Sequence, residues 1–200
     1  MATTRHLDLG CGATPRNPYG RTEVHAIDLF RPDGFDPARF HVANLACQPI
    51  PFADDRFDSA SAYDFLEHVP RVLPAAGETA TVFPFVRLMD EVWRVLKPGG
   101  RFYALTPAVP AAAAFTDPTH VNFITDETHT YFCGALPPAR AYGFAGRFEV
   151  LRAGRAMLPE DLAPAATLSW SRAAKRWLRQ ARGRLSHVVW ELEAVKPPRS

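Results

Sequence analysis

Two short clusters of polar residues carry most of the acid, base and metal-ligand chemistry available to this 200-residue chain. The first is Asp64-Phe65-Leu66-Glu67-His68, in which two carboxylates and an imidazole stand at positions i, i+3 and i+4. If a helix starts near Asp64, this spacing places all three side chains on one face. Such a face could supply half of a divalent-metal site, because carboxylates and imidazoles are common metal ligands.

The second cluster is Asp117-Pro118-Thr119-His120-Val121-Asn122-Phe123, which follows an apolar segment expected to be a strand. His120 is the candidate general base, because an unperturbed imidazole titrates at about pH 6.5. It could also be a loop residue that is only hydrogen-bonded, beside an Asx-Pro turn. We expect no bound metal. If one binds, the candidate ligands are Asp64, Glu67, His68 and His120.

A glycine turn follows the first expected strand, in the run His6-Leu7-Asp8-Leu9-Gly10-Cys11-Gly12. Glycine allows positive φ and close approach of a ligand to the backbone. A parallel sheet presents its backbone to nucleotide-like cofactors at such a turn. Pro15 stands where the third glycine of a dinucleotide fingerprint would fall, and this disfavours NAD.

The elements that must position these residues follow an α/β pattern. Phe85–Leu96 is the clearest helix, because one stripe of it is apolar, and it stops at Lys97-Pro98-Gly99-Gly100. His187–Ala194 alternates polar and apolar residues, as expected of a half-exposed antiparallel strand. The other expected strands are Arg5–Leu9, Glu23–Ile27, Phe40–Ala43, Phe57–Ala62, Arg101–Leu105 and Phe148–Arg152.

Two further segments have more than one interpretation. Residues 69–84 hold several prolines and could form a lid over the site. Residues 168–182 predict a basic amphipathic helix, which we expect to pack on the sheet with its charged face in solvent. Binding to nucleic acid is not excluded, because residues 168–184 are rich in Lys and Arg, and a membrane-surface helix is another alternative.

Composition indicates one globular domain over residues 1–200, with 47% hydrophobic and 22% charged residues. A net charge of +2 is too small to indicate nucleic-acid binding by itself. The three cysteines match neither a disulfide framework nor a zinc pattern. No apolar run approaches the length of a membrane span, and the first residues do not form a signal peptide, so we expect a cytoplasmic monomer or homodimer.

Together the motifs resemble the class I S-adenosylmethionine-dependent methyltransferases. The resemblance covers roughly residues 5–125 and rests on the glycine turn, Asp28, Asn44-Leu45, Phe57-Asp58, the Asp64–His68 cluster and Glu91–Gly100. It implies a Rossmann-like, doubly wound seven-stranded sheet in the order 3-2-1-4-5-7-6, with strand 7 antiparallel. The cofactor implied is S-adenosylmethionine, and its product is S-adenosylhomocysteine.

The resemblance also implies roles for individual residues. Asp8, Gly10, Cys11 and Gly12 would cradle the amino-acid end of the cofactor, and Asp28 would accept hydrogen bonds from its ribose hydroxyls. Asn44 and Leu45 would border the adenine, where relatives usually carry an acid before the Leu. Asp64 and Phe65 would lie at the edge of the methyl-transfer site. Asp64 and His120 are then the candidate catalytic residues, although similar Glu-His runs bind magnesium-type ions in some O-methyltransferases.

The sequence thus predicts a methyltransferase that acts on an unidentified acceptor, expected to be a small molecule. One alternative is a nicotinamide-dependent oxidoreductase, which Pro15 and the segment Leu96–Gly100 disfavour. Another is a methyltransferase-like scaffold that binds the cofactor or a partner without turnover.

Overall fold

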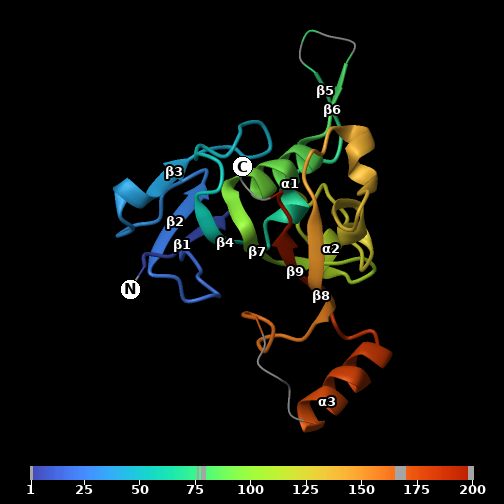
Figure 1. Ribbon diagram of the computed structural model, residues 1–200. Helices are drawn as coiled ribbons and strands as arrows, with labels where there is room; N and C mark the ends of the chain where they lie inside the picture. Colours follow the sequence, from blue (N-terminus) through green and yellow to red (C-terminus); the bar gives the residue numbers. More distant parts are fainter. Residues whose placement is uncertain (1, 76, 78–79, 165–169, 198–200) are drawn as a thin grey trace.

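A seven-stranded sheet lies at the centre of the computed structural model, which describes residues 2–75, 77, 80–164 and 170–197 (Figure 1). Its order is β3-β2-β1-β4-β7-β9-β8, and β9 is antiparallel to both of its neighbours while the other pairs are parallel. The short strands β5 (Leu73–Pro74) and β6 (Thr81–Val82) form a separate hairpin. When only the seven strands of this sheet are numbered along the chain, the order is 3-2-1-4-5-7-6, so the prediction is confirmed. The strands are β1 (Arg5–Leu9), β2 (Glu23–Asp28), β3 (Phe40–Val42), β4 (Phe57–Tyr63), β7 (Leu96–Pro107), β8 (Phe148–Ala156) and β9 (His187–Ala194).

The main core lies between the sheet and helix α1 (Pro84–Val95). Proline is favourable at the first turn of a helix, where its missing N–H costs nothing, and α1 begins at Pro84. Its apolar stripe buries Phe85, Met89 and Val92 against the sheet, as its periodicity predicts. The chain then enters β7 directly at Leu96, so this strand starts earlier than the predicted Arg101.

Strand β9 is more buried than its alternating pattern predicts. Val189 is fully buried, like its neighbours Val188 and Trp190. The reason is that β9 pairs on both sides and that Val189 packs in a second cluster with Tyr63 and Tyr103.

The helix expected from Asp64 does not form. Only one 3₁₀ turn, η2 (Leu66–His68), is present, and Asp64 precedes it with a φ of 47°. A left-handed residue cannot begin a right-handed helix, and Val69 is held extended before Pro70. Asp64 is therefore directed differently from Glu67 and His68. The remaining short helices are η1 (Pro37–Arg39), α2 (Ala113–Thr116), η3 (Thr128–Phe132) and η4 (Pro138–Tyr142).

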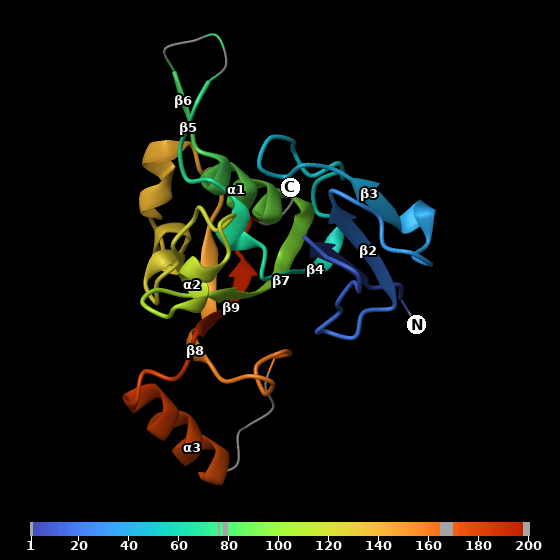
Figure 2. The ribbon, with the colours of Figure 1, turned by 180° about the vertical axis from the view of Figure 1, so that it is seen from behind.

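Two segments project from the body at opposite ends (Figures 1 and 2). One is the hairpin of β5 (Leu73–Pro74) and β6 (Thr81–Val82), which extends away from the sheet, so residues 69–84 do not form the predicted lid. The other is helix α3 (Trp170–Ala181), which stands off the sheet instead of packing on it. The predicted helix start at Leu168 lies outside the described residues. The packing expected of this helix is wrong, because its large apolar side chains are exposed.

Candidate active site

Two adjoining cavities open at the carboxyl edge of the parallel strands, where open α/β folds bind ligands. The cofactor cavity has a volume of about 490 Å³ and lies over the ends of β1, β2 and β4. The histidine cavity has a volume of about 590 Å³ and lies beyond β4 and β7. Asp64 and His68 line both cavities, so these two residues mark the boundary between them.

The glycine turn forms the floor of the cofactor cavity. Gly10 and Gly12 both line it, with φ values of 62° and 57° that disfavour any residue with a Cβ. Gly10 has a second requirement, because a Cβ there would lie 2.3 Å from the Phe65 ring. Apart from its chain neighbours, no atom of the described part of the chain stands within 4 Å of a Cβ built on Gly12. The turn is thus shaped by Phe65 on one side and left open toward the cavity on the other.

Asp28 stands at the end of β2 and faces the same cavity. Its Oδ2 accepts a hydrogen bond from the Gly12 N–H at 2.8 Å, and its Oδ1 accepts one from the Leu29 N–H at 2.6 Å. Each carboxylate oxygen keeps a further lone pair. Asp28 therefore fixes the glycine turn and can still accept hydrogen bonds from a ligand.

Asn44 and Leu45 line the far end of the cofactor cavity. Leu45 is buried and offers an apolar wall. The Asn44 Oδ1 accepts a hydrogen bond from the Ala46 N–H at 3.1 Å, the geometry of an Asx turn. The Asn44 Oδ1, which the sequence analysis placed beside the adenine, thus already accepts one hydrogen bond within the turn.

Asp8 and Cys11 lie behind the glycine turn, and neither lines the cofactor cavity. Asp8 is buried, and its carboxylate accepts hydrogen bonds from the Arg16 N–H at 2.8 Å and the Ser61 hydroxyl at 2.5 Å. The Cys11 side chain packs with Ala26 and Phe40. Asp8 therefore holds the loop after the turn, and Cys11 can face a ligand only through its backbone.

A buried polar chain continues from Asp8 through Ser61 to His6. The two ring nitrogens of His6 lie 2.8 Å from the hydroxyls of Ser59 and Ser61. Burial lowers the pKa of His6 to about 3 and raises the pKa of Asp8 to about 6. His6 is therefore neutral near pH 7. Sequence analysis missed this network, because the partners come from two strands.

This network predicts an unusual dependence of stability on pH. As pH falls below 6.5, unfolded His6 binds a proton that the folded state lacks, which costs about 1.4 kcal/mol per pH unit. Between pH 6 and 4, folded Asp8 binds a proton that the unfolded chain lacks, which stabilises the fold by a similar slope. The two contributions nearly cancel between about pH 6 and 4, so most of the loss from this pair falls between about pH 4 and 3. In urea unfolding at several pH values, Asp8→Asn should lose stability already below pH 6, and equal slopes for both proteins would contradict the prediction.

Histidine side chains dominate the second cavity. His68, His120 and His187 line it together with Asp64 and Glu67. His187 begins β9 and is the register partner of Pro107 at the end of β7, so the antiparallel strand brings it to the same edge. Its Nε2 lies 3.3 Å from Asp64 Oδ1. Sequence analysis missed His187 as a site residue, although its place at the start of an antiparallel strand was the available signal.

The tautomer of His120 follows from its surroundings. Its Nδ1 lies 3.3 Å from the Ala114 carbonyl oxygen, which can only accept, so Nδ1 carries the proton. In the neutral ring Nε2 then keeps its lone pair and lies 3.9 Å from Glu67 Oε1. This arrangement leaves Nε2 able to accept a proton. It is the geometry that a general base requires.

Glu67 is the buried acid of this cavity. Its Oε2 accepts a hydrogen bond from the Thr106 hydroxyl at 2.8 Å, whereas its Oε1 has no hydrogen-bond partner among the described residues. Burial raises the pKa of its carboxyl group. Its backbone carbonyl accepts hydrogen bonds from the N–H groups of Val121 and Asn122, both at 2.9 Å, which hold the loop that carries His120.

The four residues named as candidate ligands, in case a metal binds, are only partly brought together. Ligand atoms of Glu67, His68 and His120 lie within 4.8 Å of one another, but Asp64 is not in this group and faces His187 instead. His68 contributes one nitrogen to a 2.9 Å hydrogen bond with the Thr119 hydroxyl. The three-residue group offers fewer ligands than the four predicted.

Comparison with known proteins identifies the fold around these cavities. A family model described as a methyltransferase domain matches residues 7–104, the span from β1 to the middle of β7. This part of the chain is therefore similar to a methyltransferase domain. Among curated proteins, none matches the chain.

Several solved structures have a fold similar to that of this chain. The 1,6-didemethyltoxoflavin-N1-methyltransferase of Burkholderia thailandensis is 16% identical, with 97% of this chain and 72% of that chain covered and a TM-score of 0.56. A geranyl diphosphate methyltransferase in complex with S-adenosylmethionine is 14% identical, with 96% and 79% covered and a TM-score of 0.54. The cyclase SpnF is 19% identical, with 98% and 76% covered and a TM-score of 0.55. At these identities the likeness shows the fold.

Two of these neighbours are solved with S-adenosylhomocysteine or S-adenosylmethionine, and the cofactor cavity of this chain has the features that such a molecule would need. Gly12 leaves room that a Cβ would fill, and Asp28 offers carboxylate lone pairs at the end of β2. Leu45 supplies an apolar wall for an aromatic base, and Asp64 lies at the boundary with the second cavity. When bound, S-adenosylmethionine supplies an electrophilic methyl group on a sulfonium.

Asp28 should contribute strongly to cofactor affinity. Asp28→Ala removes a charged acceptor and the anchor of the Gly12 N–H, so binding of S-adenosylhomocysteine should weaken by about 1–3 kcal/mol in calorimetry. Asp33→Ala is the matched control, because it removes a nearby exposed acid that does not line the cavity. Equal affinities for the Asp28→Ala variant and the parent would contradict the role assigned to Asp28.

Proposed function

We propose that this methyltransferase transfers a methyl group to a small-molecule acceptor held in the histidine cavity. The observation that carries this proposal is the shared boundary of the two cavities at Asp64 and His68. An acceptor in the histidine cavity would face a cofactor bound over the glycine turn. Most of the catalysis would then come from holding the two reactants in line and excluding water.

His120 would act as the general base when the acceptor starts protonated. Its Nε2 lines the histidine cavity with its lone pair free, while Nδ1 is held by the Ala114 carbonyl oxygen. Asp64 would orient the acceptor and His187 at the boundary of the cavities. Glu67 would position the His120 loop through its backbone carbonyl and would favour the protonated imidazole after proton transfer.

Small-molecule methyltransferases among the structural neighbours support this acceptor class. A nucleic-acid acceptor is disfavoured by the acidic balance outside residues 170–184, where 17 basic residues stand against 21 acidic ones. An oxidoreductase is disfavoured because Pro15 replaces the third glycine of a dinucleotide site.

Calorimetry and a product assay test the proposal in two steps. Purified protein should bind S-adenosylhomocysteine with micromolar affinity, about −8 kcal/mol, and should not bind NADH. A panel of phenols, carboxylic acids and amines with S-adenosylmethionine should then release S-adenosylhomocysteine with at least one acceptor. Cofactor binding without turnover on any acceptor, proteins and RNA included, would instead identify a silent scaffold.

A further inference from the structure

Helix α3 and the residues that follow it concentrate positive charge. Residues 170–184 hold six Lys and Arg residues and no acid, whereas the rest of the chain has 17 basic and 21 acidic residues. The chain's small net charge of +2 therefore conceals a basic segment on an acidic body. The partner that this segment attracts is anionic. The basic residues are Arg172, Lys175, Arg176, Arg179, Arg182 and Arg184.

The same helix exposes a face of large apolar side chains. Trp170 is 85% exposed, Trp177 is 71% exposed and Leu178 is 42% exposed. With Ala174 and Ala181 they follow the spacing i, i+4, i+7, i+8 and i+11, which is one stripe of an α-helix. Two exposed tryptophans on one stripe are costly in water unless another surface covers them.

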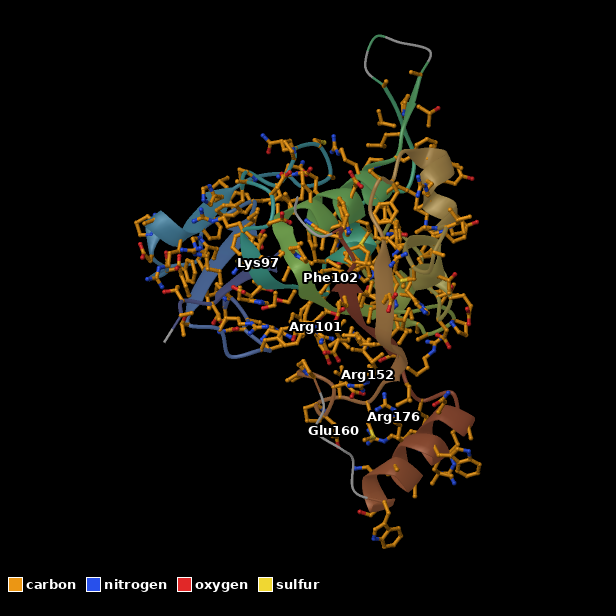
Figure 3. The ribbon with its side chains drawn as sticks, in the orientation of Figure 1. Lys97, Arg101, Phe102, Arg152, Glu160 and Arg176 are labelled. Carbon is orange, nitrogen blue, oxygen red and sulfur yellow. The ribbon has the colours of Figure 1, made fainter. Side chains whose placement is uncertain are left out.

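The protein body holds α3 by a residue outside this stripe. Arg176 forms an ion pair with the buried Asp161, with Nη2 2.9 Å from Oδ2, and donates a hydrogen bond to the Arg155 carbonyl oxygen. Asp161 also pairs with Arg152 of β8, and its carbonyl oxygen accepts a hydrogen bond from the Tyr103 hydroxyl at 2.7 Å. Figure 3 shows Arg152 and Arg176 at the junction between β8 and α3. The attachment therefore leaves the tryptophan stripe uncovered.

The helix is also joined to the active site by a short connection. Five residues, 182–186, connect Ala181 at the end of α3 to His187, which lines the histidine cavity. A surface that covers α3 would thus lie near the entrance for the acceptor.

We propose that α3 docks the protein on an anionic membrane surface. Trp170, Trp177 and Leu178 would enter the headgroup region, because tryptophan favours that interface and the stripe is otherwise uncovered. The basic residues beside the stripe would face anionic lipid headgroups. The further consequence, that the acceptor reaches the histidine cavity from the membrane, rests on the proposed function.

Charge and shape together favour a lipid surface over nucleic acid. A nucleic-acid site needs its Lys and Arg on the contacting face, whereas here the exposed stripe between the basic residues holds two tryptophans and a leucine. The acidic body would repel a polyanion that extends past the helix. A helix lying in the membrane plane needs no membrane-spanning length, and none of the described helices is long and apolar enough to span one.

Vesicle sedimentation tests the proposal with the 200-residue chain. The protein should bind vesicles of phosphatidylcholine with 30% phosphatidylglycerol at least about tenfold more tightly than vesicles of phosphatidylcholine alone, and added salt should reduce the difference. Lys175→Glu/Arg182→Glu should lose this preference, because Lys175 is exposed on α3 and Arg182 is exposed directly after it. The control Arg140→Glu/Arg147→Glu changes the same charge on the body and should retain it.

A tryptophan variant separates membrane docking from simple charge attraction. Trp170→Ser/Trp177→Ser keeps every charge but should weaken vesicle binding at least tenfold and abolish the blue shift of tryptophan emission. Trp190 is buried and Trp93 is half-buried, so both remain as a steady background.

Binding of S-adenosylhomocysteine reports folding of each variant and tests the proposed function independently of the vesicles. The docking proposal is wrong if the parent protein ignores anionic vesicles, or if the tryptophan variant binds them as well as the parent. It is also wrong if the stripe instead mediates dimerisation, seen as a tryptophan-dependent dimer by ultracentrifugation without vesicle binding. Binding to duplex RNA or DNA in place of vesicles would overturn it as well.

Discussion

His120→Ala should lower kcat by about 100-fold or more while leaving the affinity for S-adenosylhomocysteine nearly unchanged. The expected loss follows from removing Nε2, the proton acceptor that faces the histidine cavity. Cofactor affinity should survive because His120 does not line the cofactor cavity. The measurement is release of S-adenosylhomocysteine with the acceptor that the panel identifies, alongside calorimetry of the cofactor product.

Three comparisons sharpen this prediction. His129→Ala is the matched control, because His129 is a buried histidine that does not line the histidine cavity, and it should retain turnover. A chelator should have no effect if His120 acts as a base. If a metal acts instead, the chelator should abolish activity, and Glu67→Ala and His68→Ala should match His120→Ala. Full activity of His120→Ala would contradict both the general-base and the metal mechanism. His120 would then only stabilise its loop.

Gly10→Ala should nearly abolish cofactor binding. Gly12→Ala should cost little thermal stability, so that a loss of cofactor affinity can be measured by itself. Both substitutions place an L-residue at positive φ, at a cost of about 1–2 kcal/mol. At Gly10 the new Cβ also meets the Phe65 ring at 2.3 Å, so the floor of the cavity must move. We expect Gly10→Ala to lower both the thermal midpoint and the affinity for S-adenosylhomocysteine, the latter by 100-fold or more, which is about 2.7 kcal/mol.

The Cβ of Gly12→Ala meets no atom of the described residues beyond its chain neighbours, so the stability loss should stay near the cost of the backbone alone. Any additional loss of affinity would then report a cofactor lying against Gly12. Equal effects of the two substitutions on thermal midpoint and affinity would show that the contact with Phe65 does not shape the turn.

The sequence predicts the frame of the site well because strands and glycine turns are local patterns. The strand order and the antiparallel β9 match the prediction. Asp28 and Gly10 lie at one cavity, and their role toward a cofactor stays a prediction. The direction of individual side chains is not local information. Asp8 and Cys11 lie at the predicted turn. However, the pairing of β1 with β4 places Ser61 where its hydroxyl donates a hydrogen bond to Asp8, and the Cys11 side chain packs in the core.

Two features depend on how separate segments meet, and the sequence alone did not give them. His187 reaches the site only because β9 runs antiparallel beside β7, which sets its register against Pro107. The periodicity of α3 predicts its apolar stripe correctly. It does not indicate which surface will cover that stripe, and here the buried Asp161 holds the helix by Arg176 and leaves the stripe in solvent.

The register of the last two strands makes the α3 segment a separable module. Ala156 and His187 are direct partners in the ladder of β8 and β9, so the 30 residues between them leave the sheet and return to it at one point. A tight turn of about four residues would close the same ladder, and the shorter loop would save about 2 kcal/mol of closure entropy. The ladder is compatible with either connection. This position on the methyltransferase sheet is therefore a natural site for exchanging one targeting segment for another without redesigning the fold that carries the chemistry.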